Sequence, residues 1–404
     1  MWTQNVMLRT LRNCLPSQLR RIAQPLVNEL LVCFQQPYAP EAKRLSRELA
    51  RQPELQQLHA YCLKHNTWPS PLLSPPKMNP IAPFLELEVP DLPTLADLAD
   101  WLLVPHEHID SYVDRVGWRE EHGETHVNHY FTHLSPKSSG GLRLIEAPKP
   151  RLKSFQRLIL LGILSQVPTH PDSFAFTAGR DCRGGARRHS GEEVVICFDL
   201  KDYFTSIRSS RIFGLFRCLG YPSAVAHALT GLCTVVTPSR VRDRLSYDQR
   251  QMVRAPHLPQ GAPSSPALAN LVTHRLDRRL SGLARTLGGF YSRYADDMTF
   301  SGDHYIRKAV LDAVPEIVRD EGFRLNPNKT RVMASHERQI ITGLVVNQRL
   351  NVTRREFDRL KAVIHAKSWR EDPSIHARLM GQIGWVVQVH PAKGEKLRNL
   401  MERS

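Results

Sequence analysis

Two adjacent aspartates within a strongly strand-forming segment restrict the fold of this chain more than any other feature. Asp296 and Asp297 lie between residues 290–294, FYSRY, and residues 298–300, MTF. Aromatic and β-branched residues favour strands, so the segment predicts a hairpin that carries both carboxylates at its turn. Two neighbouring carboxylates repel each other, and a divalent cation relieves that repulsion. A lone Asp-Asp pair is more often a solvated turn, so the hypothesis of a metal site needs a further carboxylate.

A third aspartate follows an apolar run elsewhere in the chain. Residues 194–198, VVICF, are typical of a buried strand, and Asp199 comes directly after them. Phosphoryl transfer by two metal ions needs such carboxylates, because one ion activates the attacking hydroxyl and the other stabilises the leaving pyrophosphate, with the ions about 3.5–4 Å apart. We therefore predict Asp199, Asp296 and Asp297 as catalytic residues and metal ligands.

A turn rich in proline and glycine lies between these segments. Residues 257–266, HLPQGAPSSP, lead into a stretch with leucines on one helical face. Such a turn at a helix N-terminus brings backbone close to a nucleotide and a template base. The alternative interpretation is an ordinary helix entry.

These segments together resemble the reverse transcriptases. Asp199 with residues 200–207 resembles their motif A, residues 258–266 resemble motif B, and the Tyr-Ala-Asp-Asp sequence at 294–297 resembles motif C. Residues 322–330, GFRLNPNKT, resemble motif D. The resemblance implies an α+β fold of right-hand polymerase type, with fingers, a palm of antiparallel sheet plus helices, and a helical thumb. It also implies RNA-directed DNA synthesis with two Mg²⁺ ions and dNTP substrates, and it makes Leu200 a further Mg²⁺ ligand through its backbone carbonyl.

Within this class the chain is most similar to the bacterial retron enzymes. Residues 142–148, LRLIEAP, resemble their fingers, and residues 341–347, ITGLVVN, resemble their Val-Thr-Gly signature. A second signature, Asn-Ala-x-x-His, stands here as GARRH at 185–189, with Gly185 in place of the asparagine. The resemblance implies a structured noncoding RNA as partner, its cDNA product, a branched RNA–DNA hybrid (msDNA), and a role with an effector protein in antiphage defence.

The same resemblance assigns residues to nucleotide and RNA contacts. Phe204 would lie under the sugar and select deoxynucleotides, and Lys329 of motif D would contact the nucleotide phosphates; strand packing and a surface lysine are the alternatives. Arginine gives bidentate phosphate contacts, although many basic side chains in this chain are simply solvated. The predicted nucleotide-binding residues are Arg143, Lys153, Phe204, Gln260 and Lys329, and the predicted RNA-binding residues are His189, Arg354, Arg355 and Arg359.

Composition agrees with a nucleic-acid partner. The formal net charge of +16 requires a strongly positive surface. An anionic membrane is the alternative, but no run of about 18 apolar residues is present, and the N-terminus lacks a secretory pattern. The 7 cysteines are scattered without C-x-x-C spacing, which favours a reducing compartment. We therefore expect a cytoplasmic protein without membrane association.

The spacing of apolar residues and prolines predicts a helical N-terminal extension at residues 1–67 and a proline-rich linker at 68–93. The resemblance implies that 94–340 form the fingers and palm, and that 341–404 form the palm end and an RNA-binding thumb. A group II intron-like enzyme would carry the same motifs, although a chain of 404 residues leaves little room for a maturase module. A diversity-generating enzyme, an abortive-infection enzyme and a non-enzymatic RNA-binding scaffold are also compatible with these motifs.

Overall fold

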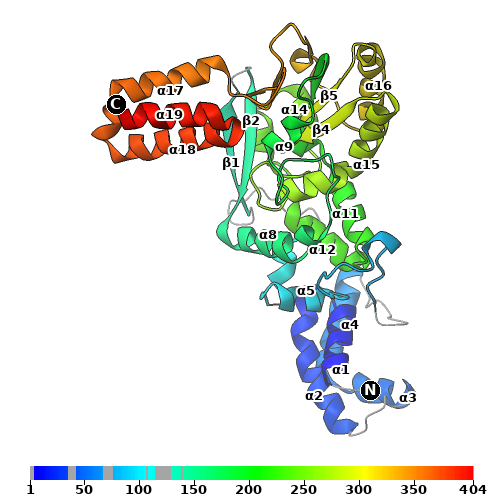
Figure 1. Ribbon diagram of the computed structural model, residues 1–404. Coiled ribbons are helices and arrows are strands. Elements are labelled where there is room, and N and C mark those ends of the chain that lie inside the picture. Colours follow the sequence, from blue (N-terminus) through cyan, green and yellow to red (C-terminus); the bar gives the residue numbers. More distant parts are fainter. Residues whose placement is uncertain are drawn as a thin grey trace. The chain divides into compact units, whose positions relative to one another are not determined.

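The chain divides into two compact units. The computed structural model describes residues 4–34, 42–66, 76–105, 108–113, 129–137 and 140–403 (Figure 1). The first unit comprises Met1–Val167 and Ile207–Ser265, and the second comprises Pro168–Ser206 and Pro266–Ser404. Helices and antiparallel strands both contribute, in agreement with the predicted α+β class. No helix of the described residues is long and apolar enough to span a membrane.

The first unit begins with the predicted helical extension. Leucines recur at three- and four-residue steps, so each helix has an apolar face, and these faces pack together around Leu26 and Leu30. Arg9 reaches beyond this cluster and pairs with Asp97 at 2.8 Å. The elements are α1 (Gln4–Cys14), η1 (Ser17–Ile22), α2 (Ala23–Cys33), α3 (Ala42–Ala50) and α4 (Pro53–His65).

The described part of the proline-rich stretch has no regular structure apart from the short 3-10 helix η2 (Ala82–Phe84), and it is tied to the rest of the first unit. The Asn79 amide donates to the Gly220 carbonyl at 2.9 Å, and the Ile81 amide donates to the Cys218 carbonyl at 3.0 Å. Gly220 has φ 96°, and a Cβ atom there would lie 2.5 Å from the Pro80 nitrogen. Only glycine therefore allows this close approach. Residues 67–75 lie outside the described residues.

The remainder of the first unit is a hairpin with surrounding helices. Strands β1 (Tyr130–Pro136) and β2 (Leu142–Pro148) pair antiparallel in full register; they flank a segment rich in serine and glycine, of which residues 138–139 are not described. Thr94 and Asp97 form a reciprocal capping box at the start of α5. The helices are η2 (Ala82–Phe84), α5 (Leu95–Trp101), α6 (Ile109–Tyr112), α8 (Pro150–Gly162), η4 (Leu164–Gln166), α11 (Ser209–Cys218), α12 (Ser223–Cys233), α13 (Ser239–Arg242) and α14 (Tyr247–Met252).

A four-stranded antiparallel sheet, which we call the palm, forms the centre of the second unit. Its strand order is β4-β5-β3-β6. Every residue of β3 is buried, as its apolar run predicts. The palm elements are α9 (Cys182–Arg187), β3 (Val194–Asp199), α10 (Tyr203–Ser206), α15 (Ser265–Thr286), β4 (Phe290–Tyr294), β5 (Asp297–Gly302), α16 (Ile306–Asp320), η5 (Pro327–Lys329) and β6 (Arg331–Ala334).

The second unit ends in a helical group, which we call the thumb. Its last helices pack side by side (Figure 1), and their apolar core includes Val195 and Cys197 from one face of β3. The palm sheet and the thumb thus share buried surface within this unit. The elements are β7 (Ile340–Ile341), β8 (Leu344–Val345), α17 (Arg354–Ala366), η6 (Ser368–Arg370), α18 (Pro373–Val389) and α19 (Pro391–Arg403).

Candidate active site

Three aspartates come together at one end of the palm sheet. Asp199 is the last residue of β3, and the antiparallel register pairs it with Asp297, the first residue of β5. Asp296 lies in the turn before β5, and its carbonyl accepts a hydrogen bond from the Leu200 amide at 2.9 Å. The strand end and the hairpin turn, which are far apart in sequence, therefore bring the three predicted carboxylates to the same edge.

The turn that carries the carboxylates contains a strained residue. Ala295 has φ 56°, in the left-handed region that glycine ordinarily occupies. Holding a non-glycine residue there costs roughly 1–3 kcal/mol, so surrounding contacts must enforce it. The Arg293 guanidinium supplies one such contact by donating to the Ala295 carbonyl at 3.0 Å.

The electrostatics of the edge reflect crowded negative charge. Burial and, to a smaller extent, the charges of Asp296 and Asp199 together raise the pKa of Asp297 to about 6. The Lys329 ammonium donates to the Asp199 carboxylate at 2.6 Å, and this hydrogen bond raises the pKa of Lys329. One lysine thus partly balances three acids.

The carboxylates fit a hard divalent cation chemically, because oxygen ligands of this kind bind Mg²⁺. Burial is the main cause of the raised pKa of Asp297, and repulsion by Asp296 and Asp199 is the part that such an ion would relieve. Within the described ranges, however, no three His, Cys, Asp or Glu side chains are already arranged to hold a metal. The Lys329 ammonium lies against one carboxylate oxygen of Asp199, Oδ2, at 2.6 Å.

Phe204 lies in the same unit as the aspartates. It belongs to α10, which begins four residues after the end of β3, and its side chain is partly buried. Its ring centroid is 5.4 Å from that of Tyr203 and 6.3 Å from that of Phe176. The Phe204 ring therefore lies beside two other aromatic rings, and its role in sugar selection stays a prediction.

The glycine-containing turn of the first unit lies against β2. The Gln260 carbonyl accepts from the Glu146 amide at 2.9 Å. Gly261 has φ 136°, and a Cβ atom there would lie 3.0 Å from the Glu146 carbonyl oxygen. The buried Glu146 carboxylate accepts from the Thr237 hydroxyl at 2.8 Å and lies 3.0 Å from His257 Nε2. This polar cluster holds the turn that carries Gln260, and sequence patterns did not reveal it.

The two predicted basic contacts of the fingers lie in that same first unit. Arg143 is on β2 and Lys153 is on α8, and both side chains are exposed to solvent. Exposure leaves each of them accessible to an anion such as a triphosphate. Their roles in nucleotide binding remain predictions.

His189 does not lie where the sequence analysis placed it. We expected an RNA contact, but the side chain is fully buried. Its Nδ1 and Nε2 atoms are each 2.7 Å from a hydroxyl, that of Ser301 and that of Ser292 respectively. Burial lowers the His189 pKa to about 3, with a smaller effect from Arg188 in the same direction. His189 is therefore a neutral core residue that joins the helix α9 region to two palm strands.

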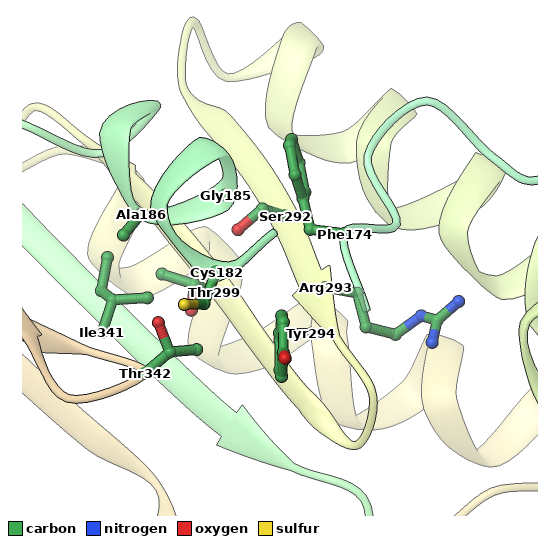
Figure 2. Close-up of a pocket in the computed structure, with 10 residues that line it drawn as sticks. All are labelled: Phe174, Cys182, Gly185, Ala186, Ser292, Arg293, Tyr294, Thr299, Ile341 and Thr342. Carbon is green, nitrogen blue, oxygen red and sulfur yellow. The ribbon is translucent and has the colours of Figure 1, made fainter. Parts of the chain in front are cut away.

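Two signature segments meet at a small pocket of the second unit. Gly185 from α9 and Thr342 from the turn after β7 both line it, together with Tyr294 (Figure 2). The Thr342 hydroxyl is buried without a hydrogen-bond partner. A Cβ atom on Gly185 would lie 3.2 Å from the Phe174 ring, so the asparagine typical of the resembling family would require that ring to shift.

The predicted RNA-binding arginines lie on the first turns of α17. All three are exposed. Arg359 donates to Glu356 at 2.7 Å, and Arg354 lies 3.5 Å from Asp358. Because these ion pairs are at the surface, each contributes little to the stability of the fold. The arginines can therefore exchange their carboxylate partners for phosphate groups.

Sequence patterns also missed a buried ion pair behind the catalytic turn. Arg293 on β4 and Asp277 on α15 are both fully buried and lie 2.7 Å apart. An arginine among the aromatic residues of a strand is the signal that would have indicated it, because a buried charge needs a partner.

Comparisons with known proteins agree on one family. Residues 135–358 match the family described as reverse transcriptase (RNA-dependent DNA polymerase). The chain is 42% identical over 284 residues to the Retron Mx65 reverse transcriptase of Myxococcus xanthus, an alignment covering 67% of this chain and 64% of that protein. It is 36% identical over 305 residues to the Retron Mx162 reverse transcriptase of the same organism, covering 70% and 62%. The chain therefore spans less than two thirds of the length of these relatives.

Among solved structures, the chain resembles telomerase from Candida albicans in complex with a TWJ fragment of telomeric RNA. The TM-score is 0.40 at 10% identity, over 67% of this chain and 56% of that chain. A score this low carries no argument about function.

Proposed function

Because this chain belongs to the reverse transcriptase family, we propose that it is an RNA-directed DNA polymerase of retron type. The observation that supports this most directly is the meeting of Asp199, Asp296 and Asp297 at one edge of the palm. Three carboxylates crowded together are costly for a fold unless they hold a cation, which argues against the non-enzymatic scaffold.

Asp199, Asp296 and Asp297 would hold two Mg²⁺ ions. When bound, such ions lower the pKa of the attacking hydroxyl and offset the charge on the leaving pyrophosphate. Lys329 would release Asp199 at this point, and its ammonium would then be available to the nucleotide phosphates or as a proton donor to the leaving group. Phe204 would exclude a ribose 2′-hydroxyl, and Gln260, Arg143 and Lys153 would hold the rest of the nucleotide.

The template would be a folded noncoding RNA. The proteins to which the chain is similar carry the name retron reverse transcriptase, and the net charge of +16 suits a large polyanion. We propose that the product is a branched RNA–DNA hybrid, that the enzyme works in the cytoplasm where dNTPs are available, and that the hybrid acts with an effector protein in antiphage defence.

Nucleotide incorporation on a primed RNA template tests the polymerase proposal. The protein with Mg²⁺ and dNTPs should extend the primer, and omission of Mg²⁺ should stop extension. A protein that binds RNA tightly but adds no nucleotide would favour the scaffold. Isolation of the protein from its host tests the retron proposal: a co-purified DNA with an RNA branch is expected, whereas DNA synthesis without a branched product would favour a group II intron-like, diversity-generating or abortive-infection enzyme.

The thumb proposal needs its own test. Replacing Arg354, Arg355 and Arg359 together by alanine should weaken binding of the cognate RNA and flatten its salt dependence, because phosphate contacts release counterions. Extension of a preannealed generic primer should change little. A matched variant replaces the exposed Arg307, Lys308 and Arg319 of α16 and removes the same charge. If both variants lost RNA binding equally, net charge and not α17 would explain the affinity.

A further inference from the structure

One buried guanidinium lies directly behind the proposed catalytic turn. Arg293 is fully buried, and its side chain points away from Ile341 and Thr342 (Figure 2). Its Nε and Nη2 atoms both donate at 2.7 Å to the two carboxylate oxygens of Asp277. Tyr291 donates a third hydrogen bond to that carboxylate at 2.8 Å. The ion pair is therefore bidentate and fully hydrogen-bonded, the geometry in which a buried charge is tolerated.

The remaining donors of this guanidinium reach elements of the proposed active site. Nη1 donates to the Ala295 carbonyl at 3.0 Å, within the strained turn that precedes Asp296. The same nitrogen donates to the Tyr203 hydroxyl at 3.0 Å, one residue before Phe204. The Arg293 side chain thus contacts both the turn that carries the carboxylates and the segment that carries the aromatic ring.

Further contacts fix the network to the palm. Asn270 accepts from Nη1 at 3.1 Å, and Ser173 accepts from Nη2 at 3.2 Å. The Tyr203 hydroxyl also contacts Thr273 at 2.9 Å. Asn270, Thr273 and Asp277 are all on α15, so this helix holds the hydrogen-bond network of Arg293 in place. An arginine supplies five donors in a planar fork, whereas a lysine supplies three on one atom and cannot reproduce these directions.

We propose that Arg293 is a positioning residue that sets two features of the reaction at once: the placement of the catalytic carboxylates and the selection of the sugar. This inference rests on the proposed function. If one group orients both segments, loosening it should impair metal binding and sugar discrimination together. A purely structural role for the buried pair would lower thermal stability and the yield of folded protein without changing either property.

Arg293→Lys is the first test, measured per folded molecule at a temperature well below its Tm. The kcat for dNTP incorporation should fall by about 10²-fold, the size expected for a small misplacement of reacting groups. The ratio of ribo- to deoxynucleotide use should rise, and Mn²⁺ binding followed by electron paramagnetic resonance should weaken. Val310→Ala is the matched control, because Val310 is buried on α16 away from the network and its loss should lower the Tm alone.

Tyr203→Phe is the second test and keeps the ion pair intact. It removes the hydroxyl that accepts from Arg293 and that also contacts Ala269 and Thr273 on α15, so the Phe204 segment loses its link to the network. Discrimination between sugars should fall while Mn²⁺ binding stays as in the wild type. If Arg293→Lys does not fold, this variant decides the matter: an unchanged ribo- to deoxynucleotide ratio overturns the proposal.

Unchanged Mn²⁺ binding and an unchanged ratio in folded Arg293→Lys would also overturn it. A wild-type protein that adds no nucleotides would instead refute the proposed function, and Mn²⁺ binding would still report whether Arg293 positions the turn.

Discussion

The buried His189 should make the palm sensitive to acid. Its pKa is lowered to about 3 in the folded protein, mainly by burial, whereas an unfolded histidine titrates near about 6.5. Between these values the unfolded chain binds more protons than the folded one, so stability is fully present above pH about 6.5 and is lost as the pH falls towards 3. Lowering the pH from 7 to 5 should cost about 2 kcal/mol through this residue, since each pH unit below about 6.5 contributes roughly 1.4 kcal/mol.

His189→Gln isolates this contribution. Glutamine does not titrate and still offers a donor and an acceptor to Ser292 and Ser301, so other acid-sensitive groups contribute equally to both proteins. Amide hydrogen exchange in β3 and β5, compared at pH 7 and pH 5 after correction for intrinsic rates, gives the local free energy of opening. The wild type should lose about 2 kcal/mol more than the variant between these pH values. Equal losses in the two proteins would refute the assignment of His189 as a neutral buried residue.

Three further predictions concern the proposed active site. Asp296→Asn should abolish DNA synthesis and leave RNA affinity nearly unchanged, because it removes one metal ligand and keeps a side chain of the same size in a partly buried turn; polymerisation within about tenfold of wild type would contradict its role as a ligand. Phe204→Ala should raise ribonucleotide incorporation by opening space beneath the sugar, and a constant ratio of ribo- to deoxynucleotide use would place the selecting group elsewhere. Gly261→Ala should raise the KM for dNTPs, because its Cβ atom would lie 3.0 Å from the Glu146 carbonyl at a φ of 136°. The control is Gly214→Ala, where nothing lies within 4 Å, and equal KM values in both variants would argue against a nucleotide contact near Gln260.

The sequence predicted the elements whose signals are local. The aromatic and β-branched residues on either side of Asp296 and Asp297 indicated a hairpin, and the apolar run before Asp199 indicated a buried strand; both are present. The register that brings Asp199 opposite Asp297 follows from the antiparallel pairing of those two elements. Local pattern and simple topology were therefore sufficient to bring the three carboxylates together.

The remaining site residues depend on partners far apart in the chain. His189 lies in the core, where it contacts Ser292 and Ser301. No local sequence pattern connects these serines with His189, so its burial could not be predicted. The partner of Arg293 is likewise set by how α15 packs on β4. The contact of Lys329 with Asp199 was not predicted either, because the sequence suggests a phosphate contact for a motif D lysine and no local pattern joins residue 329 to residue 199.

Segment 76–81 decides where the chain can be shortened. In a protein trimmed to begin at residue 94, the carbonyls of Gly220 and Cys218 would lose the hydrogen bonds that the amides of Asn79 and Ile81 donate to them. The backbone of Gly220, against which Pro80 packs, would also become exposed. A protein trimmed to begin at residue 76 would keep both bonds. The described residues of the proline-rich stretch that contact Gly220 and Cys218 therefore belong with the first unit in any shortened protein.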